Sequence, residues 1–215
     1  MHKIFPDPDL AFSLLPHAFD ARDAAHDEGH LRRVWCNVER IVAKVGGDLR
    51  VLSAATILHD CVWVDKASPE RTLASRMAAS KAREVLADLD LSTKDIEAVV
   101  HAVEAHSYSA RVVPLTLEAK VLQDADRLDA IGFIGVARCL ALAGARGAAI
   151  YDPDDPRADA RPLDDTAYAL DHFQTKLLGL GAGMQTETGR ALARARQASL
   201  RQFYEGLLAE VDEPG

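Results

Sequence analysis

Long hydrophobic runs are missing from this chain of 215 residues. The longest candidate, Ile134 to Ile150, is interrupted by Arg138 and Arg146, whereas a membrane-spanning helix needs about 18 apolar residues in succession. The N-terminal sequence MHKIFPDPDL also lacks the apolar stretch of a secretory signal. We therefore expect a cytoplasmic protein that does not contact a membrane.

Cysteine is scarce, and positive charge is not in excess. Cys36, Cys61 and Cys139 are odd in number and far apart, which fits neither a disulfide framework nor a paired-cysteine zinc site, so we expect reduced thiols in the core. The formal net charge of −8 argues against a broad surface for nucleic acid, because phosphate neutralisation needs clustered Lys and Arg. Any phosphate chemistry must therefore be local.

Strand-like alternation is nearly absent too, and helical periodicity dominates, which predicts an all-α fold. The expected helices lie at about 27–45, 49–61, 69–88, 92–106, 116–132, 166–178 and 188–208, with a break near Gly132 or Gly135. The helix after Asp48 is apolar almost all round, which predicts a position in the middle of the bundle.

One internal boundary is clear. Residues 151–165, YDPDDPRADARPLDD, contain three prolines and six aspartates, a composition that predicts a solvated loop. We expect an N-terminal segment at 1–17, a helical core at 18–145, this loop within 146–165, and a helical extension at 166–215 that packs on the core through Phe173, Leu177 and Leu178. The loop either borders the mouth of a substrate pocket or is a plain surface connection.

Imidazole and carboxylate groups occur on or beside apolar helices. His30 shares a helix face with Val34 and Ile41, so it should point inward. Asp60 follows the most apolar helix, where a carboxylate is costly unless it is paired or bound to a cation. Together with the aspartates of segment 123–132, these groups predict a shared divalent metal ion, because His and Asp ligands without thiolate suit Mn, Mg, Fe, Co, Ni or Zn.

The ordered motifs resemble a known family. HDEGHLRRV at 26–34, LHDCV at 58–62 and QDADRLDAIG at 123–132 stand in the order found in HD-domain metal-dependent phosphohydrolases. Four further segments, HAVEAHSYSA, YDPDDPRADARPLDD, HFQTKLLGL and MQTETGR, resemble the bacterial YedJ-type branch in particular. The resemblance covers roughly residues 18–200 and implies an HD-domain helical bundle with a C-terminal helical extension.

The resemblance also implies a ligand set for one divalent metal ion, whose identity it leaves open. The ligands would be His30, His59, Asp60 and one aspartate of QDADRLDA. Asp126 matches the family pattern, and Asp124 is the alternative, because helical periodicity does not decide between them.

The implied activity is hydrolysis of a small phosphate ester or anhydride, with a nucleotide as the substrate, in a monomer or homodimer. Asp60 would act in catalysis, with His26 and Asp27 orienting water or the leaving group. Candidate phosphate-binding residues are Arg33, Lys66, His101, His106 and Arg127, each of which could instead be structural. The alternatives are a non-catalytic metal- or nucleotide-binding sensor, an HD-type iron oxygenase, or a structural interaction bundle.

Overall fold

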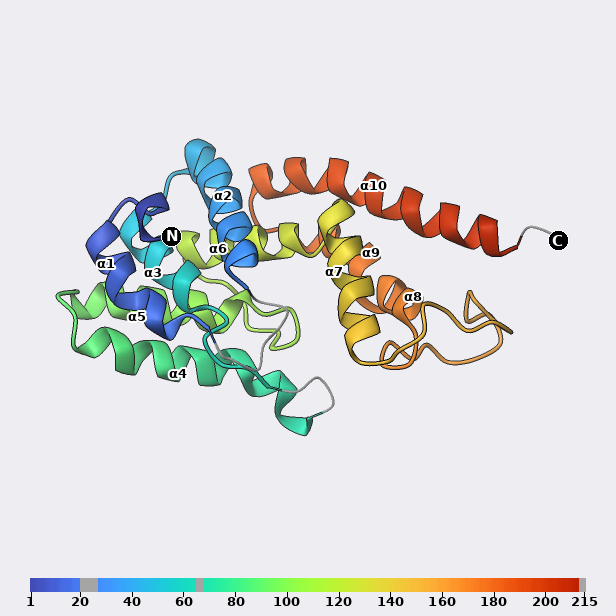
Figure 1. Ribbon diagram of the computed structural model, residues 1–215. Helices are drawn as coiled ribbons and strands as arrows, with labels where there is room; N and C mark the ends of the chain where they lie inside the picture. The colour runs from blue at the N-terminus through green and yellow to red at the C-terminus, as the bar shows by residue number, and fades with distance from the viewer. Residues whose placement is uncertain (20–26, 65–67, 213–215) are drawn as a thin grey trace. The chain divides into compact units, whose positions relative to one another are not determined.

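The computed structural model describes residues 1–19, 27–64 and 68–212, and within them the regular structure is helical (Figure 1). The α-helices are α1 (Pro8–Leu14), α2 (Glu28–Val45), α3 (Leu49–Leu58), α4 (Ala74–Ala87), α5 (Thr93–His106), α6 (Leu117–Asp129), α7 (Gly132–Ala145), α8 (Ala169–His172), α9 (Leu178–Leu180) and α10 (Glu187–Val211). A 3-10 turn, η3 (Pro69–Leu73), precedes α4, and a π-helical turn, η4 (Phe173–Leu177), joins α8 to α9. The all-α prediction is confirmed.

The chain forms two compact units, residues 1–126 and 127–215. The expected division at 17, 145 and 165 stays a prediction, since these units say only where the internal contacts are densest. Among the described residues, no single helix is long and apolar enough to cross a membrane, although α6 and α7 reach that length and hydropathy when taken together.

Helix α3 lies at the centre of the first unit, where α1, α2, α4 and α5 pack against it. Every residue from Val51 to Leu58 is buried, as the apolar sequence VLSAATIL predicts. Asp48 begins this helix by accepting hydrogen bonds from the backbone N–H groups of Arg50 and Val51. The helix therefore delivers the residues that follow it, His59 and Asp60, from the middle of the bundle.

Helix α2 begins and ends at the predicted signals. Asp27 caps its first turn, and Gly46, with φ of 76°, ends it in a backbone conformation that favours glycine. The apolar stripe is buried, including Val34, Val38 and Ile41. Cys36 is exposed on the other side of the helix, whereas Cys61 and Cys139 are buried. The prediction of three core thiols was therefore wrong for Cys36, which lies outside the stripe.

The second unit is held by α10, which packs on α7. The expected helix at 166–178 is broken into three short pieces around the π-helical turn η4. Phe173 and Leu177 are buried as expected, but Leu178 is half-buried and Leu180 is buried instead. Positions 173, 177 and 180 recur at helical spacing and share one face, whereas 178 points to another side.

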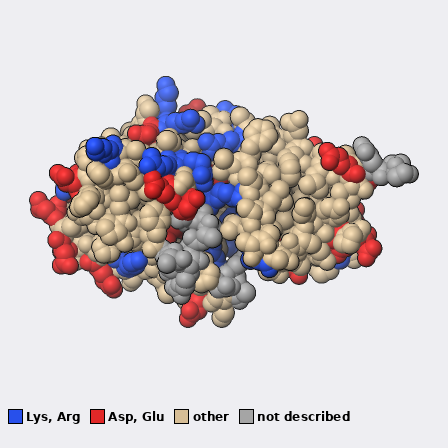
Figure 2. All heavy atoms as spheres, in the orientation of Figure 1, with Lys and Arg blue, Asp and Glu red and all other residues tan. Residues whose placement is uncertain are grey.

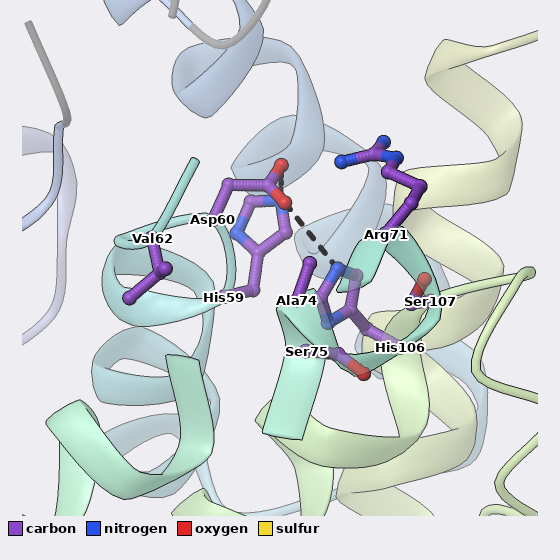
Figure 3. A pocket seen from close by; sticks show the side chains of 8 residues that line it. All are labelled: His59, Asp60, Val62, Arg71, Ala74, Ser75, His106 and Ser107. Atoms are coloured by element: carbon purple, nitrogen blue, oxygen red, sulfur yellow. Dashed lines mark ion pairs between the residues drawn. The ribbon is translucent and has the colours of Figure 1, made fainter. Parts of the chain in front are cut away.

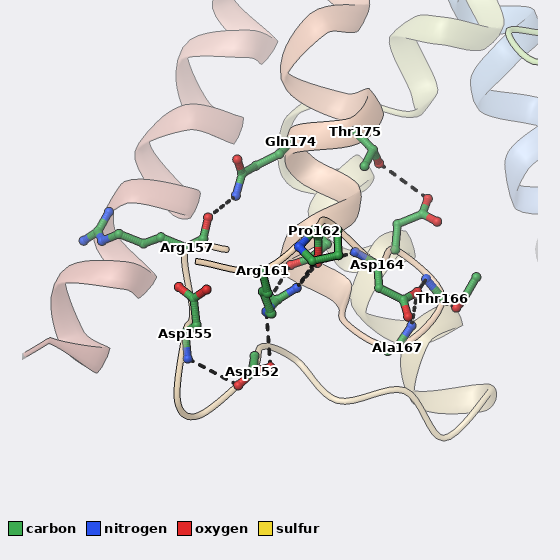
Figure 4. A network of polar contacts seen from close by, with 12 residues as sticks. Asp152, Asp155, Arg157, Arg161, Pro162, Asp164, Thr166, Ala167, Gln174 and Thr175 are labelled. Atoms are coloured by element: carbon green, nitrogen blue, oxygen red, sulfur yellow. Dashed lines mark hydrogen bonds and ion pairs between the residues drawn. The ribbon is translucent and has the colours of Figure 1, made fainter. Parts of the chain in front are cut away.

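The acidic segment 151–165 has no regular helix, as predicted, yet it is closely hydrogen-bonded (Figure 4). Asp155 accepts hydrogen bonds from the backbone N–H groups of Asp159 and Ala160. Arg161 forms a two-pronged ion pair with the buried Asp171, at 2.6 and 2.9 Å. Hydrogen bonds to the carboxylates of Asp155 and Asp171 therefore hold the backbone and the Arg161 side chain of this loop in place.

Charged side chains on the face drawn in Figure 2 are of both signs. On that face the described Lys and Arg side chains gather mainly in the upper middle part, whereas most of the Asp and Glu side chains lie toward the edges.

Candidate metal centre

Four side chains of the first unit converge, each offering one ligand atom within 4.8 Å of the others: His30, His59, Asp60 and Asp126. The Nε2 atoms of His30 and His59 are 3.2 Å apart. Oδ2 of Asp60 lies 3.0 Å from Nε2 of His59 and 3.4 Å from Nε2 of His30. Oδ1 of Asp126 lies 3.7 Å from Nε2 of His30 and 4.0 Å from Nε2 of His59. The four groups therefore enclose a possible site for one metal ion.

Three helices supply these groups. His30 lies in the first turn of α2, where its backbone N–H donates to Oδ1 of Asp27 at 2.7 Å. His59 is the residue at which α3 ends, and Asp60 follows it. Asp126 comes from α6. The N-cap of α2 and the buried position of α3 thus fix the two imidazoles in place.

The ring of His59 is oriented by a backbone contact. Its Nδ1 lies 2.7 Å from the carbonyl oxygen of Thr56, and a carbonyl can only accept, so the Nδ1–H group donates to it. In the neutral ring the lone pair therefore lies on Nε2, the atom that faces the cluster. A hydrogen bond of this kind on the far nitrogen is how proteins orient metal-binding histidines.

The charges of the four converging side chains shift the pKa values of two of them, His59 and Asp126. Burial lowers the pKa of His59, but the carboxylates of Asp60 and Asp126 outweigh it and raise that pKa to about 9. Burial likewise raises the pKa of Asp126, while the charges of His59 and His30 outweigh that effect and lower it. A proton shared among these ligands occupies the place that a divalent cation would take, so metal and proton compete.

The two candidate aspartates of α6 differ in their surroundings. Asp126 belongs to the cluster, and its side chain is 24% exposed. Asp124 is fully buried and is not in the cluster. The difference follows from the helix, because residues two apart point to different sides.

A pocket that opens to solvent borders the metal centre on the side of Asp60 (Figure 3). Its empty volume is about 310 Å³ when the adjoining open solvent is included. Its lining consists of His59, Asp60, Val62, Arg71, Ala74, Ser75, His106 and Ser107. The Nδ1–H group of the buried His106 donates to the carbonyl oxygen of Val103 at 2.6 Å. Its Nε2 lies 3.4 Å from Oδ1 of Asp60. Asp60 therefore presents one carboxylate oxygen to the two histidines of the candidate metal centre and the other to the pocket.

The other candidate phosphate-binding residues are placed differently. His101 accepts a hydrogen bond on Nε2 from the backbone N–H of Leu115 at 2.9 Å, which ties the loop after α5 to that helix. Arg127 belongs to the second unit, where it donates to the carbonyl oxygen of Gly183 at 2.7 Å. Arg33 is half-buried on α2 and does not line the pocket. His26 and Lys66 lie outside the described residues.

The pocket also contains residues that the sequence did not single out. Arg71, Ser75 and Ser107 come from η3, α4 and the end of α5. The sequence contains only a weak indication that Arg71 is functional, because it is simply a basic residue just after the helix start at Ser68 and Pro69. Its proximity to Asp60 depends on packing between segments and not on a motif.

Comparison with known proteins gives consistent results. The HD domain family model matches residues 28–131. The uncharacterized protein YpgQ of Bacillus subtilis is 34% identical over 196 residues, which cover 89% of this chain and 86% of YpgQ. This chain therefore belongs to the HD-domain family.

Solved structures extend the similarity to nearly the whole chain. A Lactobacillus plantarum protein has a TM-score of 0.73 at 30% identity, covering 94% of this chain and 96% of that one. An HD-superfamily hydrolase of Bacillus thuringiensis has a TM-score of 0.71 at 26% identity, with both chains fully covered. Bacillus subtilis YpgQ in complex with ADP has a TM-score of 0.69 at 29% identity, covering 95% and 97%. These relatives support a metal-dependent hydrolase, and the narrower YedJ-type resemblance stays a prediction.

Proposed function

We propose that this protein is a metal-dependent phosphohydrolase that cleaves a phosphate ester or anhydride bond of a small molecule, with a nucleotide as the substrate. The observation that carries the proposal is the convergence of His30, His59, Asp60 and Asp126 beside a solvent-open pocket. The ADP bound to the related YpgQ supports a nucleotide as the ligand class.

These four residues would hold one divalent metal ion, and the donor set fits such an ion because two imidazole nitrogens and two carboxylate oxygens face one another without a thiolate. A metal ion bound there would lower the pKa of a water molecule and neutralise phosphoryl charge. The hydrogen bond from Nδ1 of His59 to the carbonyl oxygen of Thr56 orients one imidazole for this role. The helix cap at Asp27, which accepts from the backbone N–H of His30, positions the other.

The remaining chemistry falls to side chains of the pocket. Asp60 turns its Oδ1 atom toward His106 and the pocket, where it can accept a hydrogen bond from an attacking water. His106 holds that carboxylate from the other side. We retain His26 with Asp27 as candidates for orienting water or the leaving group, and Arg33, Lys66, His101 and Arg127 as candidate phosphate-binding residues.

The test is a nucleotide panel assayed with Mn²⁺, Mg²⁺ and Ni²⁺, in which phosphate and pyrophosphate are measured separately. Replacing His59 or Asp60 by Ala should release the metal and abolish turnover, because each loses a ligand from a partly buried charged cluster. Asp88→Ala removes an exposed carboxylate of the same unit and should change neither the metal content nor the turnover.

Full activity in metal-free Asp60→Ala protein would refute the hydrolase mechanism. Metal binding by the wild type without release of phosphate or pyrophosphate from any nucleotide would favour the sensor alternative. Consumption of dioxygen with bound iron would favour the oxygenase.

A further inference from the structure

Among the described residues that line the pocket beside the metal centre, Arg71 is the one arginine or lysine. It lies in η3, whose start is fixed by Ser68, the hydroxyl of which accepts a hydrogen bond from the backbone N–H of Glu70 at 3.2 Å. Nη1 of Arg71 donates to the carbonyl oxygen of Val64 at 3.3 Å. In Figure 3 the guanidinium group extends toward the carboxylate of Asp60. The side chain is therefore anchored at one nitrogen and directed over the pocket.

The charge of Arg71 is not neutralised within the part of the chain that the structure describes. Nearby arginines of the same unit differ, since Arg76 pairs with Glu104 and Arg83 pairs with Glu97. A guanidinium has five N–H groups in a planar fork, and one of these donates to Val64. The other donors remain for a ligand, and their geometry suits phosphate oxygens.

The pocket itself has room and unused hydrogen-bonding capacity. The side chains of Ala74 and Ser75 are small, which leaves space between η3 and the end of α5. Ser75 is 3% exposed, and its hydroxyl has no hydrogen-bond partner among the described residues. Because buried polar groups are normally hydrogen-bonded, an ordered water or a ligand oxygen is expected to complete this wall of the pocket.

We propose that Arg71 binds the phosphoryl group next to the one held at the metal centre, and so selects substrates with two linked phosphoryl groups over single phosphate esters. This inference rests on the proposed phosphohydrolase function and narrows its substrate class to phosphoanhydrides, such as nucleoside diphosphates and triphosphates. Asp60 borders both the candidate metal centre and the pocket, because its Oδ2 atom faces His59 and its Oδ1 atom faces His106 in the pocket wall. A linked pair of phosphoryl groups could therefore reach the metal centre and Arg71 together, whereas a lone phosphoryl group would reach one of them.

Binding of two stable probes, methylenediphosphonate and methylphosphonate, tests this assignment independently of turnover. Isothermal titration of the Mn²⁺-loaded protein should show tighter binding of the diphosphonate by the wild type. Arg71→Ala should weaken diphosphonate binding by about 10-fold to 100-fold, the usual effect of losing charge-assisted hydrogen bonds. Its affinity for methylphosphonate should change by less than about 3-fold, and its metal content should stay that of the wild type.

Two further variants separate charge, geometry and general effects. Arg71→Lys keeps the charge but loses the planar fork, so its affinity for the diphosphonate should fall between those of Arg71→Ala and the wild type. Arg76→Ala removes an exposed arginine that follows five residues later and does not line the pocket, and it should bind both probes as the wild type does.

The assignment is overturned if Arg71→Ala binds the diphosphonate as tightly as the wild type, if it loses both probes equally, or if the wild type does not discriminate between the probes. Its failure is distinguishable from failure of the proposed function. A wild type that hydrolyses nucleotides beside an unaffected Arg71→Ala variant refutes the role of Arg71 alone. A wild type that discriminates between the probes but hydrolyses no phosphate compound refutes the hydrolase proposal and leaves the role of Arg71 standing.

Discussion

Oδ1 of Asp60 lies 3.4 Å from Nε2 of His106, whereas the other oxygen of the same carboxylate, Oδ2, faces His59 in the candidate metal centre. His106 is buried and is held by its own hydrogen bond to the carbonyl oxygen of Val103. The two residues come from different helices, α5 and the segment after α3. His106 therefore limits how the Asp60 carboxylate can rotate, which makes it a positioning residue for Asp60, a proposed metal ligand.

Replacing His106 by Ala should lower turnover or metal affinity by about 10-fold to 100-fold, the usual effect of losing a group that orients a metal ligand. Metal titration and steady-state kinetics would measure the two effects. Lys94→Ala is the control from the same helix, because Lys94 is exposed and does not line the pocket. Equal behaviour of the two variants would mean that the contact with Asp60 has no positioning role.

The choice between Asp126 and Asp124 leads to a second prediction. Asp126→Asn should lose metal more completely than Asp124→Asn, because an amide oxygen is a weaker ligand than a carboxylate for a hard divalent cation. Asp124→Asn should instead lower the free energy of unfolding, since Asp124 is fully buried. Metal content and urea unfolding of both variants decide the matter, and the reverse order of metal loss would assign the ligand role to Asp124.

Much of the first unit could be predicted from local patterns. The apolar sequence of α3 and the stripe of α2 require burial, and capping residues such as Asp27, Asp48 and Ser92 set the helix starts. Helix α1 was missed, although Asp7 and Pro8 are a usual helix start. Its seven residues contain too little periodic pattern to stand out in a single sequence.

Other features depend on contacts between distant segments. Arg71 and His106 are 35 positions apart and meet in one pocket because of packing. The π-helical turn at Phe173–Leu177 was not predictable, because a helix with one extra residue per turn has nearly the same local pattern as an α-helix. Asp124 and Asp126 share a helix and a composition, so only the placement of the neighbouring imidazoles separates them.

The raised pKa of His59 predicts how the metal-free protein responds to pH. In the unfolded chain the pKa is 6.5, and in the folded chain it is about 9, so the folded state binds the proton more tightly. This contribution to stability is fully present below pH 6.5 and is lost as the pH rises through about 9. The free energy of unfolding should therefore fall by up to about 3 kcal/mol over that window.

Urea unfolding in the presence of a chelator, between pH 6 and pH 9.5, would measure this loss. His59→Gln should flatten the curve, because the titrating group is removed. With Mn²⁺ bound the trend should reverse, since the metal displaces the proton and its affinity rises with pH up to about 9. A metal-free protein whose stability does not change over the window would contradict the assignment of a bound proton to His59.

The ion pair between Arg161 and Asp171 predicts where the second unit is most sensitive to mutation. Asp171 is fully buried, and it accepts hydrogen bonds from both terminal nitrogens of Arg161 and from the backbone N–H of Asp164. Asp171→Ala should lower the free energy of unfolding by about 3–5 kcal/mol, because it removes the buried acceptor of two guanidinium nitrogens and of the backbone N–H of Asp164. Nε of Arg161 keeps its ion pair with Asp152 at 3.2 Å. Asp154→Ala is the control, since the exposed Asp154 takes part in the loop through its backbone N–H, which alanine retains. Urea unfolding would compare the two, and a loss below about 1 kcal/mol in Asp171→Ala would show that solvent replaces the pair and that the acidic loop is not held in place by it.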